Sequence, residues 1–300
     1  MLLKEFISKA VAVLEQTCAL DEARAIVFAL CEDVLGTKSY THIIEPDYKV
    51  PEASLPGLEE KLSRLEAGEP LQYVTGHCSF CGFDFKVSPD VLIPRQETEL
   101  LCRHAIDFVS RIMRMRSSAG KFAVPVRILD LCTGSGCIAW TLALSVPGVE
   151  VVAVDNSEKA LQVAATQPFR EYARKHNINV PQFICQDILS PGFGSDLGVF
   201  SLITSNPPYV RESEKACMNK NVLDYEPASA LFVPDDDPLL YYRAVASISM
   251  RCLEDEGMGF TEINEAFGPA TAGIFTEGGF ARTEVIKDIS NRNRIVRYSR

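Results

Sequence analysis

Apolar residues recur at three- and four-residue steps through the first 70 residues of the chain. The segments 2–16, 21–36 and 54–68 have this spacing, and Gly36 stands where a helix would end. Such a period places one apolar stripe on each helix and leaves the other side polar. The pattern therefore predicts a helical domain over residues 1–75.

A different pattern follows in "LQYVTGHCSFCGFDFKVSPDVLIP", residues 71–94. Short alternating runs flank Gly82, as in two strands joined by a tight turn. We therefore predict a β-hairpin linker over residues 76–95. Residues 95–116 return to helical spacing, and residues 117–125 have the composition of a loop.

From residue 126 onward, short apolar runs alternate with helical segments. The runs that we interpret as strands are 126–132, 150–157, 180–187, 200–209 and 257–264, followed by two β-rich runs on either side of "ISNRN". This alternation is typical of a parallel sheet with helices on both faces. The predicted fold class is α/β: a seven-stranded mixed sheet over residues 96–300, with the last two strands as a closing antiparallel pair.

Polar clusters stand at the ends of four of these strands. They are the segment 130–136 and the residues Asp155, Asp187 and Asn206. The carboxyl ends of parallel strands meet at one edge of a sheet, and ligands bind in the crevice beyond them. The four clusters therefore predict one binding crevice.

The net charge and the length of the apolar runs bear on whether the protein binds nucleic acid or a membrane. A formal net charge of −10 argues against nonspecific binding to nucleic acid, which depends on Lys and Arg. The densest basic run, Arg111, Arg114 and Arg116, fits a solvated helix end. No apolar run approaches the roughly 20 residues that span a bilayer. We expect a cytoplasmic protein with no membrane contact and no direct nucleic-acid binding.

The ten cysteines are scattered along the chain. Cys78 and Cys81 have the spacing of half a zinc site, but no second pair stands at a matching distance. We therefore expect two packed thiols and no metal site.

The segment "DLCTGSGCIA" follows a predicted strand and opens a helix. Gly134 and Gly136 allow the backbone to approach a ligand closely, and the helix N-terminus favours an anion. Asp155 ends the next strand, where a carboxylate can bind both hydroxyls of a ribose. Together these features predict a cofactor that contains adenosine.

Two cofactor classes fit the glycine motif. "GSGCIA" matches a loose dinucleotide fingerprint, so a nicotinamide dehydrogenase is one candidate. Asp130 suits a cationic or ammonium-bearing ligand better than a pyrophosphate, and Asp187 can accept from an adenine amine. Because S-adenosylmethionine carries an ammonium, a sulfonium, a ribose diol and an adenine amine, these acids favour it.

The stretch "SNPPY" ends the fourth predicted strand. An amide or aromatic amine nitrogen is a poor nucleophile, so an enzyme that methylates it must orient the lone pair and hold both N–H bonds. Asn206 offers a side-chain carbonyl, and Pro207 offers a backbone carbonyl where the ring fixes φ. Pro208 adds no competing donor, and Tyr209 offers an aromatic face. We predict a rigid two-acceptor clamp for an NH2 group.

The motifs that carry a family resemblance are "GEPLQYVTG", "VLIPRQETE", "DLCTGSG", "NPPY" and "YEPASAL". In this order and spacing, the chain resembles the release factor glutamine methyltransferases, the PrmC/HemK group, from about residue 60 onward. The resemblance implies a Rossmann-like class I methyltransferase domain, S-adenosylmethionine, and N5-methylation of the Gly-Gly-Gln glutamine of class 1 peptide chain release factors. It implies a substrate-recognition role for the helical domain.

The same resemblance assigns the site residues. It places cofactor contacts at Thr133, Gly134, Gly136, Asp155 and Ile188, with Asp130, Asp187 and Asn206 in support. It places the substrate amide at Asn206, Pro207, Pro208 and Tyr209, with Asn206, Pro207 and Tyr209 as the catalytic group.

The chain departs from the family pattern at two positions. Cys132 replaces a glycine, which costs about 1 kcal/mol if φ is positive there, and Gln96 replaces a proline. We interpret Arg95, Glu97 and Thr98 as a helix start with an internal ion pair. Glu226 is interpreted as part of a solvated loop, with substrate recognition as the alternative.

Two other functions use parts of the same pattern. An adenine-N6 methyltransferase acting on DNA or RNA needs the same clamp, but we expect such an enzyme to carry a basic recognition region. A non-catalytic adenosine-binding module requires a vestigial clamp, whereas all four clamp residues are present.

Overall fold

The computed structural model describes residues 1–118 and 125–300, so most of the predicted loop 117–125 lies outside the described residues. The described chain divides into two compact units. One contains residues 1–77 and 219–225, and the other contains residues 78–218 and 226–300. The first unit therefore contains the N-terminal region together with a short segment from far along the chain.

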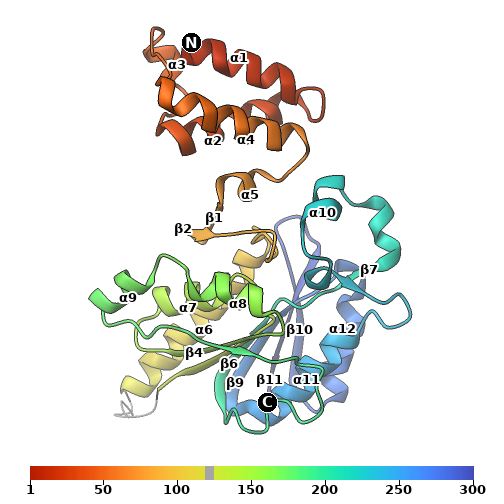
Figure 1. Ribbon diagram of the computed structural model, residues 1–300. Helices are drawn as coiled ribbons and strands as arrows, with labels where there is room; N and C mark the ends of the chain where they lie inside the picture. Colours follow the sequence, from red (N-terminus) through yellow and green to blue (C-terminus); the bar gives the residue numbers. More distant parts are fainter. Residues whose placement is uncertain (119–124) are drawn as a thin grey trace. The chain divides into compact units, whose positions relative to one another are not determined.

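The first unit is helical, as the periodicity predicts (Figure 1). Its helices are α1 (Leu3–Leu14), α2 (Leu20–Leu35), α3 (Thr41–Ile44), η1 (Glu52–Ser54), α4 (Leu55–Glu66), α5 (Leu71–Thr75) and α10 (Lys220–Tyr225). Buried side chains such as Phe6, Leu30 and Leu58 share one core. Gly36 ends α2 with φ 67°, in agreement with its expected role. Tyr225 of α10 donates its hydroxyl to the carbonyl of Ala67 at 3.0 Å.

The predicted hairpin consists of β1 (His77–Phe80) and β2 (Phe83–Lys86). Cys81 and Gly82 join the two strands with φ values of 51° and 79°. Two successive positive φ angles match the right-handed twist of the flanking strands.

The second unit contains a seven-stranded sheet with the order β10-β11-β9-β6-β3-β4-β5. Its strands are β3 (Arg127–Leu131), β4 (Glu150–Asp155), β5 (Gln182–Cys185), β6 (Phe200–Ser205), β9 (Leu253–Glu262), β10 (Arg282–Lys287) and β11 (Asn293–Ser299). Strands β3, β4, β5, β6 and β9 run parallel, and β11 pairs antiparallel with both β9 and β10. This is the expected mixed sheet of a Rossmann-like class I methyltransferase, including its closing antiparallel pair.

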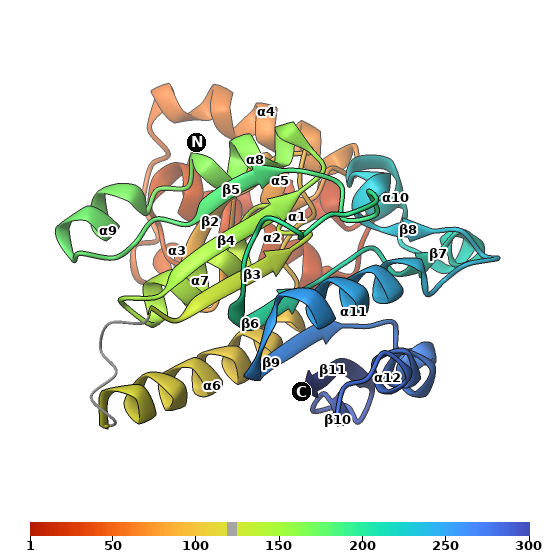
Figure 2. The ribbon, with the colours of Figure 1, turned by 90° about the horizontal axis from the view of Figure 1, so that it is seen from below.

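Helices cover both faces of this sheet (Figures 1 and 2). The helices of the second unit are α6 (Thr98–Ser118), α7 (Cys137–Ser145), α8 (Glu158–Ala165), α9 (Arg170–Lys175), η2 (Glu212–Cys217), η3 (Ala228–Ala230), α11 (Leu240–Cys252), η4 (Glu265–Phe267) and α12 (Gly268–Glu277), and the short strands β7 (Val210–Arg211) and β8 (Phe232–Val233) pair with each other. Helices α6 and α7 share one core with the sheet, and α11 and α12 share the other. Two apolar layers therefore hold the strand ends in place.

One basic residue departs from the expected solvated helix end. Arg116, in the last turn of α6, contacts the Ser201 hydroxyl at 3.1 Å and the Glu254 carboxylate at 2.5 Å. The prediction of a solvated side chain was wrong for Arg116, because these partners lie on neighbouring strands and are far away in sequence.

Candidate functional site

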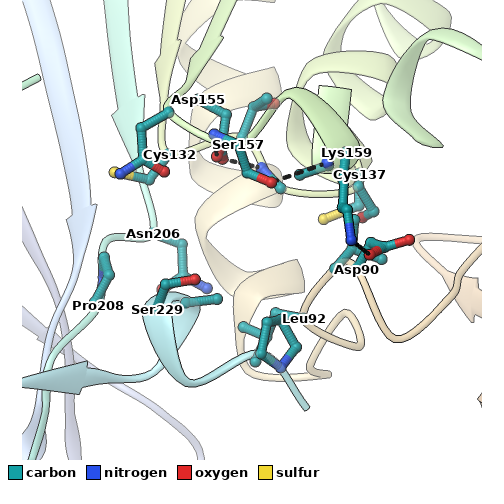
Figure 3. A pocket seen from close by; sticks show the side chains of 18 of the residues that line it. Asp90, Leu92, Cys132, Cys137, Asp155, Ser157, Lys159, Asn206, Pro208 and Ser229 are labelled. Atoms are coloured by element: carbon teal, nitrogen blue, oxygen red, sulfur yellow. Dashed lines mark hydrogen bonds and ion pairs between the residues drawn. The ribbon is translucent and has the colours of Figure 1, made fainter. Parts of the chain in front are cut away.

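A pocket of about 270 Å³ lies at the carboxyl ends of β3, β4, β5 and β6. Its lining comes from parts of the segments 89–98, 132–138, 155–160, 186–188, 206–208 and 227–230, and from Tyr241 of α11. All of these residues belong to the second unit. The four clusters predicted to share a crevice each contribute at least one residue to this pocket, including Asp155 and Asn206 (Figure 3).

The loop between β3 and α7 forms one wall. Cys132, Gly134 and Gly136 all have positive φ, at 60°, 55° and 77°. A cysteine at φ 60° carries the local strain of about 1 kcal/mol that the glycine-to-cysteine departure predicts. Thr133 donates its backbone N–H to the Val154 carbonyl at 3.0 Å, which ties the loop to β4.

Gly136 has a different role from the one expected. It does not line the pocket. A Cβ placed there would lie 3.0 Å from the Ala164 Cβ and 3.2 Å from the Trp140 ring. Glycine at this position therefore permits close packing of α7 against α8. Gly134 lines the pocket instead, and its backbone faces Asp155.

The Asp155 carboxylate is held by two backbone donors. The N–H of Gly134 lies 2.8 Å from Oδ2, and the N–H of Ser157 lies 3.0 Å from Oδ1. Burial raises the pKa of Asp155, and these backbone hydrogen bonds oppose the rise. Because each carboxylate oxygen can accept more than one hydrogen bond, both can still bind hydroxyl groups in the pocket.

Asp130 is placed beneath the loop and does not line the pocket. Its side chain is fully buried, and its two oxygens accept from the hydroxyls of Thr133 at 2.6 Å and Thr204 at 2.8 Å. Burial raises the pKa of Asp130 to about 7. The expectation of a direct contact with a cationic ligand needs correction: Asp130 supports the loop through Thr133.

The segment after β5 supplies a second acidic group. Asp187 lines the pocket with an exposed side chain, and its Oδ1 accepts from the N–H of Leu189 at 2.9 Å. Ile188 is buried and also lines the pocket. An apolar side chain beside an accepting carboxylate suits an adenine ring with its amine.

Two of the four residues of the Asn-Pro-Pro-Tyr stretch line the pocket. Asn206 and Pro208 line the pocket, whereas Pro207 and Tyr209 do not. The Tyr209 hydroxyl donates to Oε1 of Glu262 at 3.0 Å. Tyr209 is half-buried and is not among the residues that line this pocket, so stacking of its aromatic face on the acceptor stays a prediction. Asn206 donates through Nδ2 to the hydroxyl of Thr98 at 3.2 Å.

Two residues within the quoted motifs, Arg95 and Glu226, were misread from the sequence. Arg95 does not pair with Glu97 but with Glu226, at 2.5 Å. Glu226 is buried and accepts the backbone N–H of Ile93 at 3.1 Å, so the prediction of a solvated loop was wrong. In the sequence, the only signal of the contact between Glu226 and Arg95 is that Glu226 precedes a proline in "YEPASAL". This signal is weak, because Arg95 lies 131 positions away.

Asp90 and Lys159 lie on the wall across from Cys132 and Asn206 (Figure 3). The Lys159 ammonium lies 3.5 Å from Oδ1 of Asp90, and both side chains are substantially exposed. Lys159 stands in no motif that the sequence analysis singled out, and Asp90 directly precedes the motif "VLIPRQETE". The Asp90 carboxylate therefore offsets the positive charge of Lys159 at this wall of the pocket.

The described residues contain no group of three or more His, Cys, Asp or Glu side chains that is arranged to hold a metal ion. Burial raises the pKa of the Cys78 thiol to about 11. Within residues 1–118 and 125–300, no helix combines the length and the apolar character that crossing a bilayer requires.

Comparisons with known proteins identify the families that the chain matches. Residues 5–76 match the family model of the PrmC N-terminal domain, and residues 95–224 match that of the methyltransferase small domain. A solved structure of the hMettl16 catalytic domain in complex with an RNA hairpin has a TM-score of 0.51 at 11% identity, and the match covers 83% of this chain and 82% of that one. At that identity the likeness concerns the fold alone.

Two curated relatives match nearly the whole chain. The release factor glutamine methyltransferase of Bacteroides thetaiotaomicron is 37% identical, and the match covers 93% of this chain and 94% of the relative. That of Flavobacterium psychrophilum is 35% identical, with 99% of both covered. The chain therefore belongs to the release factor glutamine methyltransferases.

Proposed function

We propose that this protein transfers a methyl group from S-adenosylmethionine to the side-chain amide N5 of the glutamine in the Gly-Gly-Gln motif of class 1 peptide chain release factors. The observation that carries the proposal is that one pocket is lined both by Asp155 and by Asn206. The carboxylate that would bind the ribose and the carbonyl that would bind the substrate amide therefore line the same pocket.

The lining fits S-adenosylmethionine better than a dinucleotide. Asp155 and Asp187 are both acceptors in the pocket, and the two cationic lining residues, Lys159 and Arg95, are paired with Asp90 and Glu226. Two carboxylates repel a pyrophosphate and attract hydroxyl, amine and sulfonium groups. When bound, S-adenosylmethionine supplies an electrophilic methyl group. Asp155 would hold its ribose, Asp187 and Ile188 its adenine, and the Thr133–Gly134 loop its remaining polar atoms.

The acceptor amide needs two hydrogen-bond acceptors. The carbonyl of the Asn206 side chain and the backbone carbonyl of Pro207 would take the two N–H bonds of the substrate NH2 group. With both N–H bonds held, the nitrogen lone pair points at the methyl group, and the two carbonyls stabilise the positive charge that develops on nitrogen. The product nitrogen can release its proton to water, so no general base is required.

The helical first unit supports a protein substrate. Residues 5–76 match the family model of the PrmC N-terminal domain, and the chain carries a net charge of −10. A folded protein loop can be gripped by such a helical unit without the basic surface that a nucleic acid requires. The proposal places the protein in the cytoplasm, where release factors act.

The test offers the purified protein tritiated S-adenosylmethionine with both classes of acceptor. We expect label in a recombinant class 1 release factor, mapped by peptide mass to the Gly-Gly-Gln glutamine, and no label when that glutamine is replaced by alanine. Label that appears in DNA or RNA and never in the release factor would support the adenine-N6 alternative and overturn the proposal.

A further inference from the structure

Asn264, two residues beyond the end of β9, contacts the Asn-Pro-Pro-Tyr stretch from outside the pocket. Its side-chain Nδ2 donates to the backbone carbonyl of Tyr209 at 3.1 Å and lies 3.2 Å from Oε2 of Glu214. Asn264 is 8% exposed, and it is not among the residues that line the pocket. Its contact with Tyr209 therefore acts on the protein backbone and not on a ligand in the pocket.

Backbone groups on two sides set the orientation of the Asn264 amide. Oδ1 accepts from the N–H of Ala266 at 3.0 Å, which caps the short helix η4. A backbone N–H can only donate and a backbone carbonyl can only accept, so the amide nitrogen faces Tyr209. The backbone N–H of Asn264 donates to the hydroxyl of Tyr242, a buried residue of α11, at 3.0 Å. Asn264 is therefore a donor that is itself held in place.

The two prolines of the clamp leave one backbone torsion to be fixed from outside. Their rings set φ at Pro207 and Pro208, and neither residue has an N–H that could anchor it. Asn206 and Pro207 each precede a proline, which restricts their ψ. The torsion that stays free is ψ of Pro208, and it is determined by whatever holds Tyr209. The direction of the Pro207 carbonyl therefore depends on the anchoring of Tyr209.

The strand pair next to Tyr209 is too short to anchor it alone. The N–H groups of Tyr209 and Val210 donate to the carbonyl of Leu231 at 3.2 and 2.9 Å, beside the two-residue ladder of β7 and β8. An isolated pair of short strands is marginally stable at best. The amide of Asn264 and Oε1 of Glu262, which accepts from the Tyr209 hydroxyl at 3.0 Å, connect this pair to the end of β9.

We propose that Asn264 is a positioning residue that anchors Tyr209 to the end of β9 and so holds the Pro207 carbonyl in the direction that the acceptor NH2 group requires. This role rests on the proposed function, because that direction matters for catalysis only if the carbonyl accepts from a substrate amide. A displacement of about 1 Å in a reacting geometry can cost on the order of 100-fold in rate.

Two substitutions remove the donor and keep the cap of η4. Asn264→Asp keeps the shape of the side chain and can still accept from Ala266, but it presents an oxygen to the Tyr209 carbonyl and to Glu214. Asn264→Ser keeps an oxygen that suits an N-cap, adds no charge, and is too short to reach the Tyr209 carbonyl.

Two further variants separate positioning from stability. Glu214→Gln keeps an acceptor for the Asn264 amide and leaves the bond to Tyr209 in place. Combined with Asn264→Asp, it removes the repulsion between two carboxylates but does not restore a donor to Tyr209. Asn179→Asp breaks a 3.0 Å bond from a side-chain amide to the Val149 carbonyl, and neither of these residues lines the pocket. It is the matched control for the loss of such a bond.

The experiment measures kcat and KM for methyl transfer to a recombinant release factor, cofactor Kd by titration, and stability by urea unfolding. We expect Asn264→Asp and Asn264→Ser to lower kcat by roughly 10- to 100-fold. Cofactor Kd should be unaltered, because Asn264 does not line the pocket. Glu214→Gln and Asn179→Asp should retain kcat. The double variant Asn264→Asp with Glu214→Gln should regain stability relative to Asn264→Asp and remain as slow.

Three outcomes would overturn the proposal. They are full kcat in Asn264→Ser, recovery of kcat together with stability in the double variant, and an equal loss of kcat in Asn179→Asp. If Asn264→Asp does not fold, the comparison of Asn264→Ser with Asn179→Asp decides the question.

Hydrogen exchange of the Tyr209 and Val210 amides, measured by NMR without any substrate, tests the anchor separately from the proposed function. We expect both amides to exchange faster in Asn264→Asp and Asn264→Ser, and at the original rate in Glu214→Gln. Unchanged exchange in the two Asn264 variants would reject the anchor. An absence of methyl transfer by the unaltered protein, with the faster exchange observed, would reject the proposed function only.

Discussion

Gly134 donates its backbone N–H to the carboxylate of Asp155 at 2.8 Å, from the loop after β3 to the end of β4. The two residues are 21 positions apart, and both line the pocket. This contact aligns the wall of the pocket with its main acidic group. The candidate cofactor site is therefore built from the ends of both β3 and β4. Substitutions at one strand end can be tested separately from those at the other.

Asp155→Asn keeps the size of the side chain and removes its charge. We expect cofactor Kd to rise by about 10- to 100-fold, as is typical when a hydrogen bond to a charged group is lost. Isothermal titration with S-adenosylmethionine measures this change. Asp236→Asn, at an exposed position, is the control and should leave Kd unaltered. Equal affinities for all three proteins would remove Asp155 from the site.

Asn206→Ala should preserve cofactor binding and remove most turnover, with kcat lower by about 100- to 1000-fold, as for the loss of one group that stabilises a developing charge. The reason is that, in the proposed mechanism, the Asn206 carbonyl accepts from the acceptor amide and contributes little to binding of the adenosine. Methyl transfer to the release factor measures kcat, and titration measures cofactor Kd. Retention of full turnover would disprove the clamp.

Asp130 should make the stability of the protein depend on pH. The pKa of its carboxyl is raised from an ordinary 3.8 to about 7 by burial, so between these values the folded protein binds more protons than the unfolded chain. Its contribution to stability is therefore present below pH 4 and is lost as pH rises to 7, by up to about 1.4 kcal/mol per pH unit.

The Asp130→Asn variant lacks this titration. Urea unfolding between pH 4.5 and 7.5 should show the variant gaining stability relative to the unaltered protein as pH rises. A difference that stays constant across this range would contradict the prediction.

Glu226→Gln should destabilise the second unit. The Glu226 side chain is 1% exposed and that of Arg95 is 34% exposed, so the substitution leaves a partly buried guanidinium without its counter-charge. We expect a loss of about 2–4 kcal/mol in the free energy of unfolding, measured by urea denaturation. Glu171→Gln breaks an exposed pair with Lys175 and should change stability by less than about 0.5 kcal/mol. Equal effects in both variants would be inconsistent with a buried ion pair.

Gly136→Ala should lower the free energy of unfolding more than a glycine-to-alanine substitution at a similar φ with open space around the new Cβ. Both left-handed strain of about 1 kcal/mol and contacts near 3.0 Å to Ala164 oppose the new Cβ, so we expect about 2–4 kcal/mol in total. Gly36→Ala, at φ 67° with nothing within 4 Å, should cost only the strain. Thermal and urea unfolding compare the two variants. Similar losses would show that helix packing at Gly136 tolerates a side chain.

The sequence by itself determined the order of elements and the positions of the strand ends. Hydrophobic period is a property of neighbouring residues, so the helical first unit, the hairpin at Gly82 and the closing antiparallel pair could all be predicted locally. The same reasoning placed Asp155 and Asn206 at one edge of the sheet, because the ends of parallel strands must meet there.

Only the tertiary structure decided which side chains face the pocket and which support it. Asp130 lies inside because β3 is flanked by β4 and β6, and Thr204 lies beside it in register. The pairs Arg95–Glu226 and Tyr209–Glu262 join residues 131 and 53 positions apart. Such contacts arise from the packing of distant segments, and no local period encodes them. The sequence therefore located the site, whereas packing determined the orientation of its groups.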